Sequence, residues 1–340
     1  MKKSKMGKTI KWIAISLIGL MLVTILGLIA NNRVMAMKYN KLDTNTDVLT
    51  NENLSAVEDV YEYLQQDGYT IFDGLGGNTD LIIYNDQFEF LICDDDSVPG
   101  WRCIGNNAAL NKNIFSRNAD NPQAFAVLAG DTWIGSMSTK DTFNKAMVNT
   151  VPFFFPPQFV MIDDAHYRGL VIHEMVHAYE ANNNNARFMQ IQSIHDVCED
   201  YYGDQAFNEL IAKEAYYLEQ AITAAAYEDV LANTGKFIEM RERRRTECQM
   251  SMSDIQDEMD FEWLEGLARY AEYKASSGSN SLVAKNLIDI DQKVKVKSDE
   301  RYYTLGMAQA LVLDKLKEDW KNDIFTDGFS MEACIKGILE

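Results

Sequence analysis

The stretch His173-Glu174-Met175-Val176-His177 decides more about the fold than any other part of this 340-residue chain. It follows the pattern H-E-x-x-H, and on a helix its two histidines lie at positions i and i+4, one turn apart on the same face. Two imidazole nitrogens placed in this way can both bind one tetrahedral Zn²⁺ ion. Glu174 can then hold a metal-activated water and take its proton as general base. The motif therefore predicts a zinc-binding helix with His173 and His177 as metal ligands.

The flanks of the motif are apolar. Gly169-Leu170-Val171-Ile172 precedes it and Ala178-Tyr179 follows it, and Glu174 is the one charged residue within it. Dry surroundings strengthen the field of a bound metal, so these flanks favour a buried site. We expect Asp164 to cap this helix at its N-terminus. The alternative is a surface helix whose histidines face solvent.

Composition and the N-terminal segment predict an acidic, membrane-anchored protein. The formal net charge of −19 argues against nucleic-acid binding, which needs a basic surface. A lysine-rich tail, residues 1–11, precedes an uncharged run of 19 residues from Trp12 to Ala30, about the span of a bilayer core. The lysines predict a cytoplasmic N-terminus, a single pass and an extracellular catalytic domain. The alternative is cleavage after Ala36, which would give a secreted protein.

Patterning along the rest of the chain predicts the α+β class. Residues 31–53 are polar and indicate a stalk. A helix is expected over Ser55–Gln66. Strands are expected at Leu81–Tyr84, Phe88–Ile92, Ala124–Leu128, Thr132–Met137 and Phe159–Ile162. Later helices are expected at roughly 205–232, 235–249, 253–276, 299–320 and 330–339. The catalytic domain then has a small β-rich N-terminal part, 54–163, and a mainly helical zinc-binding part, 164–340.

Other reactive or charged residues are expected to be mostly structural. None of the five cysteines forms a C-x-x-C pair, which argues against a cysteine zinc knuckle. Cys93 and Cys103 lie close enough in sequence to suggest a disulfide in an oxidising compartment. We expect His166 and His195 to be structural, with a place near the metal as the alternative. Arg243-Arg244-Arg245 is expected on a solvated helix face, with substrate binding as the alternative.

A catalytic zinc needs a third protein ligand and one open position. A third histidine on the pattern H-E-x-x-H-x-x-G-x-x-H is excluded, because Glu180 and Asn183 stand where Gly and His are required. A glutamate from a later helix remains. Glu262, Glu265 and Glu272 are the candidates, and Glu262 lies one turn before Glu265 on a similar face.

A resemblance distinguishes among these glutamates. The segment Phe261–Tyr273, FEWLEGLARYAEY, resembles the W-L-N-E-G-F-A-x-Y-x-E helix of the aminopeptidase N-like zinc peptidases, without the Asn. The resemblance implies that Glu265 is the third zinc ligand and that Gly266 allows helices to approach closely around the metal. It extends to Tyr302-Tyr303-Thr304-Leu305-Gly306, where a Y-x-x-G implies that Tyr303 stabilises the tetrahedral intermediate. A tyrosine of the core is the alternative for Tyr303.

These features together resemble a gluzincin, a zinc metallopeptidase with two histidines and one glutamate as ligands, and imply a zincin-like fold. The expected partner is a peptide or protein substrate, bound along a sheet edge near Val160. The long interval between His177 and Glu265 implies a helical insertion, and the G-x-M-E-N segment of the family is absent. Two other functions remain: a membrane-anchored binding protein with a structural or degenerate zinc site, and a zinc hydrolase of non-peptide amides.

Overall fold

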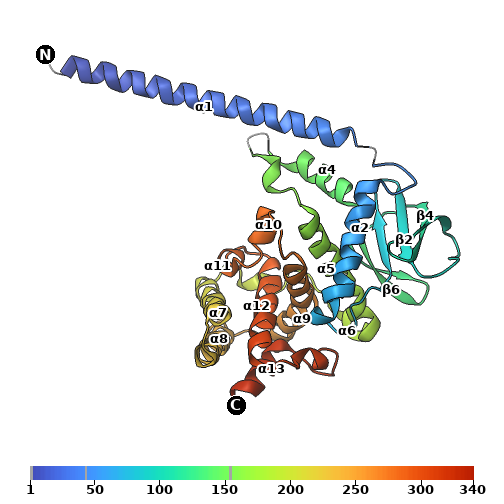
Figure 1. The fold of residues 1–340 in the computed structure, drawn as a ribbon. Helices are drawn as coiled ribbons and strands as arrows, with labels where there is room; N and C mark the ends of the chain where they lie inside the picture. The colour runs from blue at the N-terminus through green and yellow to red at the C-terminus, as the bar shows by residue number, and fades with distance from the viewer. Residues whose placement is uncertain (1–2, 43, 153–154) are drawn as a thin grey trace.

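A mixed β-sheet packs against a larger body of helices in the computed structural model, which describes residues 3–42, 44–152 and 155–340 (Figure 1). The six strands of the described residues lie in the order β3-β4-β2-β1-β6-β5. Their bounds are β1 Leu81–Tyr84, β2 Phe88–Cys93, β3 Arg102–Asn107, β4 Lys112–Asn118, β5 Phe125–Ala129 and β6 Thr132–Ser138. Among these strands β1 and β6 pair in parallel, and the other neighbours are antiparallel. The α+β class is confirmed.

Helices precede, cover and follow the sheet. The longer ones are α1 Lys3–Asn40, α2 Asn51–Tyr63, α4 Lys140–Thr150, α5 Asp164–Asn183, α6 Asn185–Ile191, α7 Gln205–Thr223, α8 Tyr227–Glu247, α9 Met252–Ala275, α12 Glu300–Leu316 and α13 Met331–Leu339. Short helices are α3 Tyr69–Ile71, α10 Leu282–Lys285 and α11 Ile290–Lys293. Helices α7 and α8 form the insertion expected between the two zinc-binding segments.

The two faces of the sheet bury side chains of alternating residues, as the period of two in a strand requires. Leu81 and Ile83 of β1 belong to the main core beneath the helices, whereas Ile82 belongs to a small cluster on the opposite face. Helix α5 lies directly on the sheet at β6. A Cβ atom added to Gly135 would lie 2.8 Å from the Cα of Met175, so the helix that carries the H-E-x-x-H motif touches the strand backbone.

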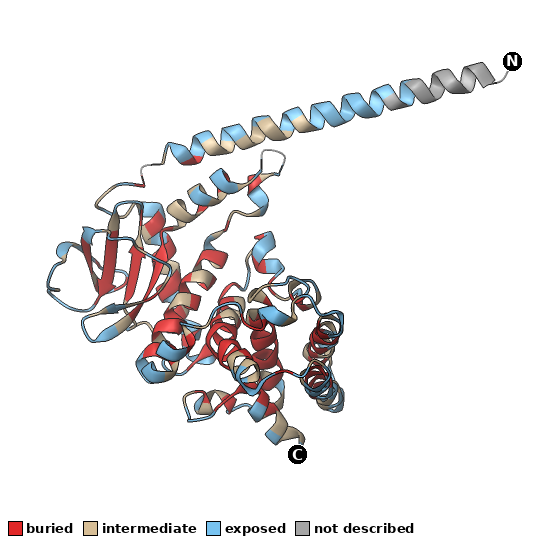
Figure 2. Cartoon of the chain, turned by 180° about the vertical axis from the view of Figure 1, so that it is seen from behind, coloured by how far each residue is buried: buried red, intermediate tan, exposed pale blue. Residues whose placement is uncertain are grey.

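Helix α1 extends away from the rest of the molecule and is mostly exposed (Figure 2). It continues past the predicted anchor and ends at Asn40, inside the expected stalk, and α2 then begins at Asn51. The part from Ile15 to Asn40 is long and apolar enough to cross a membrane, and none of its apolar window is buried. It is the one such helix among the described residues.

Four of the five predicted strands are confirmed as β1, β2, β5 and β6. The prediction for Phe159–Ile162 is wrong, because this segment holds the end of a 3₁₀ turn, Pro157–Phe159, and an irregular connection. The Asn144 side chain takes the place of a neighbouring strand here. Its Oδ1 accepts from the Ile162 N–H at 2.9 Å, and its Nδ2 donates to the Ile162 carbonyl at 3.2 Å.

Each predicted helix is present, but the bounds of most of them shift. Asp163, and not Asp164, caps α5, because its side chain accepts from the N–H of His166. The expected helix over 205–232 is divided at Ala224, where α7 ends and a short turn leads into α8. Strands β3 and β4 and, among the longer helices, α4 and α6 were not predicted. Their sequences mix polar and apolar residues without a clear period.

The suggested disulfide between Cys93 and Cys103 is wrong. Cys93 lies on β2 and Cys103 on β3, and β4 runs between these two strands. Two strand spacings amount to about 9.5 Å, beyond the reach of a disulfide. Cys93 is buried, Cys103 is exposed, and both are free thiols.

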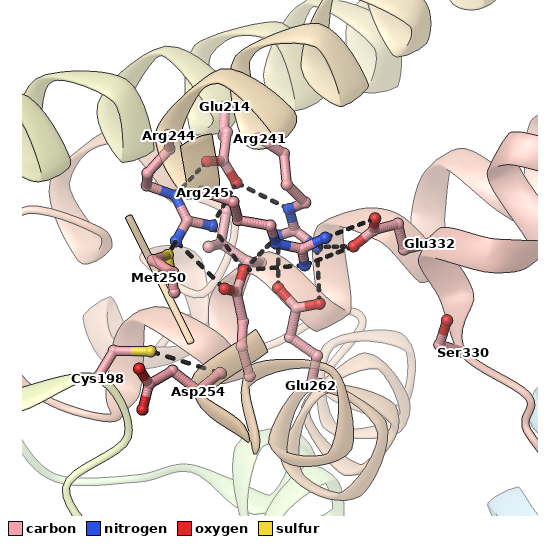
Figure 3. A network of polar contacts seen from close by, with 12 residues as sticks. Cys198, Glu214, Arg241, Arg244, Arg245, Met250, Asp254, Glu262, Ser330 and Glu332 are labelled. Atoms are coloured by element: carbon pink, nitrogen blue, oxygen red, sulfur yellow. Dashed lines mark hydrogen bonds and ion pairs between the residues drawn. The ribbon is translucent and has the colours of Figure 1, made fainter. Parts of the chain in front are cut away.

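A buried network of arginines and glutamates joins the insertion to α9 (Figure 3). Arg241 Nη2 donates to Glu262 Oε1 at 2.6 Å, and Arg244 Nη2 donates to Glu258 Oε1 at 2.6 Å. Glu214 of α7 accepts from both arginines. The expectation of a solvated face is therefore wrong for Arg244, which is fully buried.

Arg243 is the one residue of the run Arg243–Arg245 that lies on a solvated helix face, as expected. Its side chain is half exposed and pairs with Glu247 one turn later on α8. Arg245 resembles Arg244 instead, since it is largely buried and donates to both oxygens of Glu332 on α13. The network leaves neither Arg244 nor Arg245 available to a substrate.

We predict that Arg244→Leu lowers the free energy of unfolding by about 3–5 kcal/mol, because Glu258 loses its hydrogen-bonded cation and Glu214 keeps only Arg241. Chemical denaturation followed by circular dichroism measures this loss. The matched substitution Arg243→Leu removes an exposed pair and should leave stability nearly unchanged. Equal effects of the two substitutions would contradict the importance of the buried network.

Candidate metal centre

Three buried side chains from two helices converge on one point. The Nε2 atoms of His173 and His177 on α5 lie 3.2 Å apart. Oε2 of Glu265 on α9 lies 3.6 Å from the first and 3.5 Å from the second. Each residue offers one ligand atom, and together the three could hold a metal ion. We call His173, His177 and Glu265 the ligand group. The structure thus brings together the three residues that the sequence predicted as ligands.

The other nitrogen of each histidine faces a carboxylate. His177 Nδ1 lies 3.1 Å from Glu180 Oε2, and His173 Nδ1 lies 3.2 Å from Glu272 Oε2. Such a carboxylate fixes the orientation and tautomer of a metal-binding imidazole. Glu180 was not predicted for this role, although its spacing of three residues from His177 places it on the same helix face. Glu272, a predicted alternative ligand, supports a ligand instead.

Glu262, the other alternative ligand, lies outside the group. Both its oxygens accept from Arg241, and Oε2 also accepts from Gln309 at 2.8 Å. A carboxylate committed to these partners has no contact with the histidines. The contact with buried Arg241 therefore distinguishes Glu262 from Glu265. The helical period alone does not distinguish these two glutamates.

Charge around the group shifts the pKa values of its histidines. Burial lowers the pKa of His173, but hydrogen bonds to Glu265 and Glu272 outweigh it and raise that pKa to about 9. Burial also lowers the pKa of His177. The charge of Glu265 and the hydrogen bond to Glu180 outweigh burial and raise that pKa well above its ordinary value. The carboxylates around the two imidazoles therefore favour their charged forms, while the histidines oppose each other's charge.

Glu174 is the carboxylate of the motif that has no committed partner. No hydrogen bond or ion pair to its side chain occurs within the described residues, and it remains partly exposed. Burial raises its pKa, as do the charges of Glu265 and Glu272, while the two histidines lower it. A free carboxylate with a raised pKa beside the ligand group can accept a proton.

Tyr303 on α12 lies beside the ligand group. Its ring stacks on His173 with centroids 6.4 Å apart and an interplanar angle of 17°. The Arg269 guanidinium lies over the same ring at 5.1 Å. Burial and the charge of Glu265 raise the pKa of Tyr303, so its hydroxyl stays protonated and can donate a hydrogen bond. Its neighbour Tyr302 is fully buried near Cys198 and has no place in the site.

The close crossing of α9 and α12 places Tyr303 near Glu265. A Cβ atom on Gly266 would lie 2.5 Å from the Cα of Gly306, and one on Gly306 would lie 2.5 Å from the Glu262 carbonyl oxygen. No other residue type fits at either position without moving a helix. The expectation that Gly266 permits a close approach is confirmed, and its counterpart is the glycine of the Y-x-x-G segment.

The remaining histidines lie outside the ligand group. His166 is buried, with Nδ1 3.0 Å from the Ser281 hydroxyl and Nε2 3.6 Å from Glu272. His166 therefore contacts Glu272, which in turn contacts His173. His195 lies exposed in the connection that follows α6.

Strand β5, at the edge of the sheet, borders the ligand group. The ring of Phe125, its first residue, lies 4.6 Å from the ring of His177. Its outer side has no neighbouring strand among the described residues. The sheet edge near the site is therefore β5 and not the segment around Val160, where no strand forms.

Comparisons with known proteins assign no family to the chain. No family model matches it, and no curated protein or solved structure matches it either. The resemblance to the aminopeptidase N-like peptidases is therefore carried by the short segments around His173, Glu265 and Tyr303 alone.

We predict that Gly306→Ala lowers the free energy of unfolding by about 1–3 kcal/mol, because the added methyl group forces α12 away from α9. Thermal and chemical denaturation measure the change. Gly235→Ala is the matched control, since Gly235 lies inside α8 with nothing within 4 Å of the added Cβ. That substitution should stabilise the protein by about 0.4–1 kcal/mol. A stable Gly306→Ala variant would contradict the tight crossing.

Proposed function

We propose that this chain is a zinc-dependent metallopeptidase, held at a membrane by its N-terminal helix. One observation carries the proposal: three ligand atoms of His173, His177 and Glu265 converge beside a free carboxylate, Glu174, on the same helix as the histidines. A gluzincin site needs this combination of two imidazoles, one carboxylate ligand and one base. A zincin-like fold is part of the proposal.

The spacing of the ligand atoms suits zinc. A tetrahedral ion with bonds of 2.0–2.1 Å holds its ligand atoms about 3.3 Å from one another. The three distances here are 3.2, 3.5 and 3.6 Å. The described residues supply three ligands, whereas a structural zinc site has four. This count supports a catalytic site and weighs against the structural-zinc alternative.

The side chains then divide the steps of hydrolysis. When bound, zinc polarises the scissile carbonyl and lowers the pKa of a water. Glu174 takes a proton from the attacking water and gives it to the departing amine as the carbon–nitrogen bond breaks. The Tyr303 hydroxyl donates a hydrogen bond to the developing oxyanion. Glu180 and Glu272 keep the two imidazoles oriented throughout.

Strand β5 is the proposed binding edge for a peptide or protein substrate. An extended peptide can add to an open sheet edge through backbone hydrogen bonds, and Phe125 places this edge beside His177. A non-peptide amide would not use the strand edge. The position of β5 therefore favours the peptidase over the amidase alternative.

Helix α1 is the proposed single-pass anchor, with the lysine-rich end in the cytoplasm and the catalytic domain outside the cell. Retention of the anchor is supported by Ala36, which lies inside α1 and not in a loop. Proteolytic cleavage favours exposed, irregular segments. The secreted form cleaved after Ala36 is the alternative.

We predict that Glu174→Gln retains zinc but loses peptide hydrolysis by about 10²–10⁴-fold, because it removes the general base. Glu265→Ala should lose zinc. Elemental analysis after dialysis and turnover of a fluorescence-quenched peptide library measure the two effects. His195→Ala, at an exposed histidine outside the group, is the control and should change neither. Full turnover by Glu174→Gln would remove Glu174 as the general base, whereas zinc binding without hydrolysis in the unchanged protein would favour the binding-protein alternative.

We predict that zinc affinity rises with pH between 6 and 8. The raised pKa values of His173, about 9, and of His177 mean that zinc must displace their protons. Affinity should rise about tenfold per pH unit for each displaced proton. Chelator competition at several pH values measures the slope, and calorimetry in two buffers of different ionisation enthalpy counts the released protons. A flat profile would contradict the raised pKa values of the two histidines.

A further inference from the structure

An uncharged segment rich in phenylalanine and proline connects α4 to α5. Residues 151–161 contain four phenylalanines and three of the five prolines of the chain. We call residues 155–161 the aromatic loop. Phe155 keeps 37% and Phe159 keeps 45% of its surface exposed, and their rings meet edge to face at 5.7 Å. Adjacent exposed aromatic rings on an uncharged segment indicate a contact surface.

Side-chain amides fasten the aromatic loop to α1. Asn31 Nδ2 donates to Gln158 Oε1 at 3.1 Å, and Gln158 Nε2 donates back to Asn31 Oδ1 at 3.0 Å. Asn32 Nδ2 donates to the Phe155 carbonyl at 2.9 Å. In Figure 1 the end of α4 and the segment after it lie beside α1, in agreement with these contacts. The loop is thus fixed at a defined level along the helix.

That level is where α1 changes from apolar to polar. The uncharged run from Trp12 to Ala30 is 19 residues long, which is about 28 Å at the helical rise. A bilayer core is about 30 Å thick. If this run crosses the bilayer, Asn31 reaches the boundary between lipid tails and headgroups, and it brings the aromatic loop there with it.

The backbone of the aromatic loop suits a poorly hydrated environment. Pro156 and Pro157 have no N–H group. The N–H groups of Phe159, Val160 and Met161 all donate to proline carbonyls within the loop. Backbone donors that are already paired lose little when water is removed, whereas unpaired donors would oppose insertion.

We propose that the aromatic loop is a membrane-contact surface, in which Phe155 and Phe159 insert at the headgroup boundary where α1 leaves the bilayer. Aromatic side chains concentrate at this boundary, and apolar side chains can enter it to a depth of about 5–10 Å. The partner is a lipid bilayer, and because the loop is uncharged, zwitterionic lipid suffices. The anchor and the loop then hold the folded body against the membrane at two points. The proposal rests on the anchor of the proposed function but not on catalysis.

The test uses the full chain in nanodiscs of zwitterionic lipid. A photoreactive benzophenone amino acid replaces Phe159 in one sample and Tyr69 in the other. Tyr69 is an exposed aromatic residue at the start of α3, and it serves as the matched control. After irradiation, mass spectrometry should find lipid adducts at position 159 and none above background at position 69. Adding Phe155→Asp should abolish the adducts at 159, because a carboxylate at the boundary opposes insertion.

Three results would overturn the proposal: no lipid adduct at position 159, equal adducts at both positions, or adducts at 159 to a second copy of the chain. The intact mass of each sample shows whether α1 is still present. Loss of α1 would show that the anchor failed, whereas an intact chain without lipid adducts would show that the loop failed. Zinc content and peptide hydrolysis of the same samples report separately on the proposed function.

Discussion

The placement of buried carboxylates on α9 is the constraint on which the rest of the structure depends. This helix carries Glu258, Glu262, Glu265 and Glu272, and all four are buried. A buried carboxylate is tolerated only with a cation or several hydrogen-bond donors beside it. The first two meet arginines from α8, and the last two meet histidines from α5. The glutamates in the first part of α9 therefore pair with arginines, and those in its later part face the two histidines of the candidate metal centre.

This division explains why α5, α8 and α12 must all contact α9. Helix α8 supplies the arginines, α5 supplies the histidines, and the crossing at Gly266 and Gly306 lets α12 come close enough to set Tyr303 beside His173. The insertion α7–α8 is therefore part of what holds the ligand helix. Its Arg241 binds Glu262 one turn before Glu265, so a shift of the insertion would shift the ligand group as well.

The sequence predicted those parts of the fold that have a strong local signal. The four confirmed strands have apolar runs or alternation, and the spacing of the H-E-x-x-H motif places its two histidines on one helix face. The edge strand Arg102–Asn107 has no such signal, because few of its side chains are buried. Phe159–Ile162 looks like a strand, yet Asn144 satisfies the backbone of Ile162 and prolines precede it. In both cases the structure depends on a partner far away in the sequence or outside the segment: β4 pairs with Arg102–Asn107, and Asn144 binds Ile162.

The site shows the same limit. The helical period placed Glu262 and Glu265 on similar faces, and only the partner of each tells them apart. A resemblance could single out Glu265, but no local pattern indicated that Arg241 would occupy Glu262. Glu180 was within reach of sequence reasoning, since its spacing from His177 is that of neighbours on a helix face. In the three-histidine pattern Glu180 only marks the position where a glycine is missing, which says nothing about its contact with His177.

Carboxylates outnumber cations around the ligand group. Glu174, Glu180, Glu265 and Glu272 surround two histidines, and Arg269 supplies a single cation at Glu272. The excess of carboxylates raises the pKa values of both histidines, so protons on the imidazoles partly neutralise the group. A divalent cation at the three convergent ligand atoms would supply two positive charges in place of such protons. The excess of carboxylates around the two imidazoles is therefore a charge distribution that favours a divalent cation over a monovalent one.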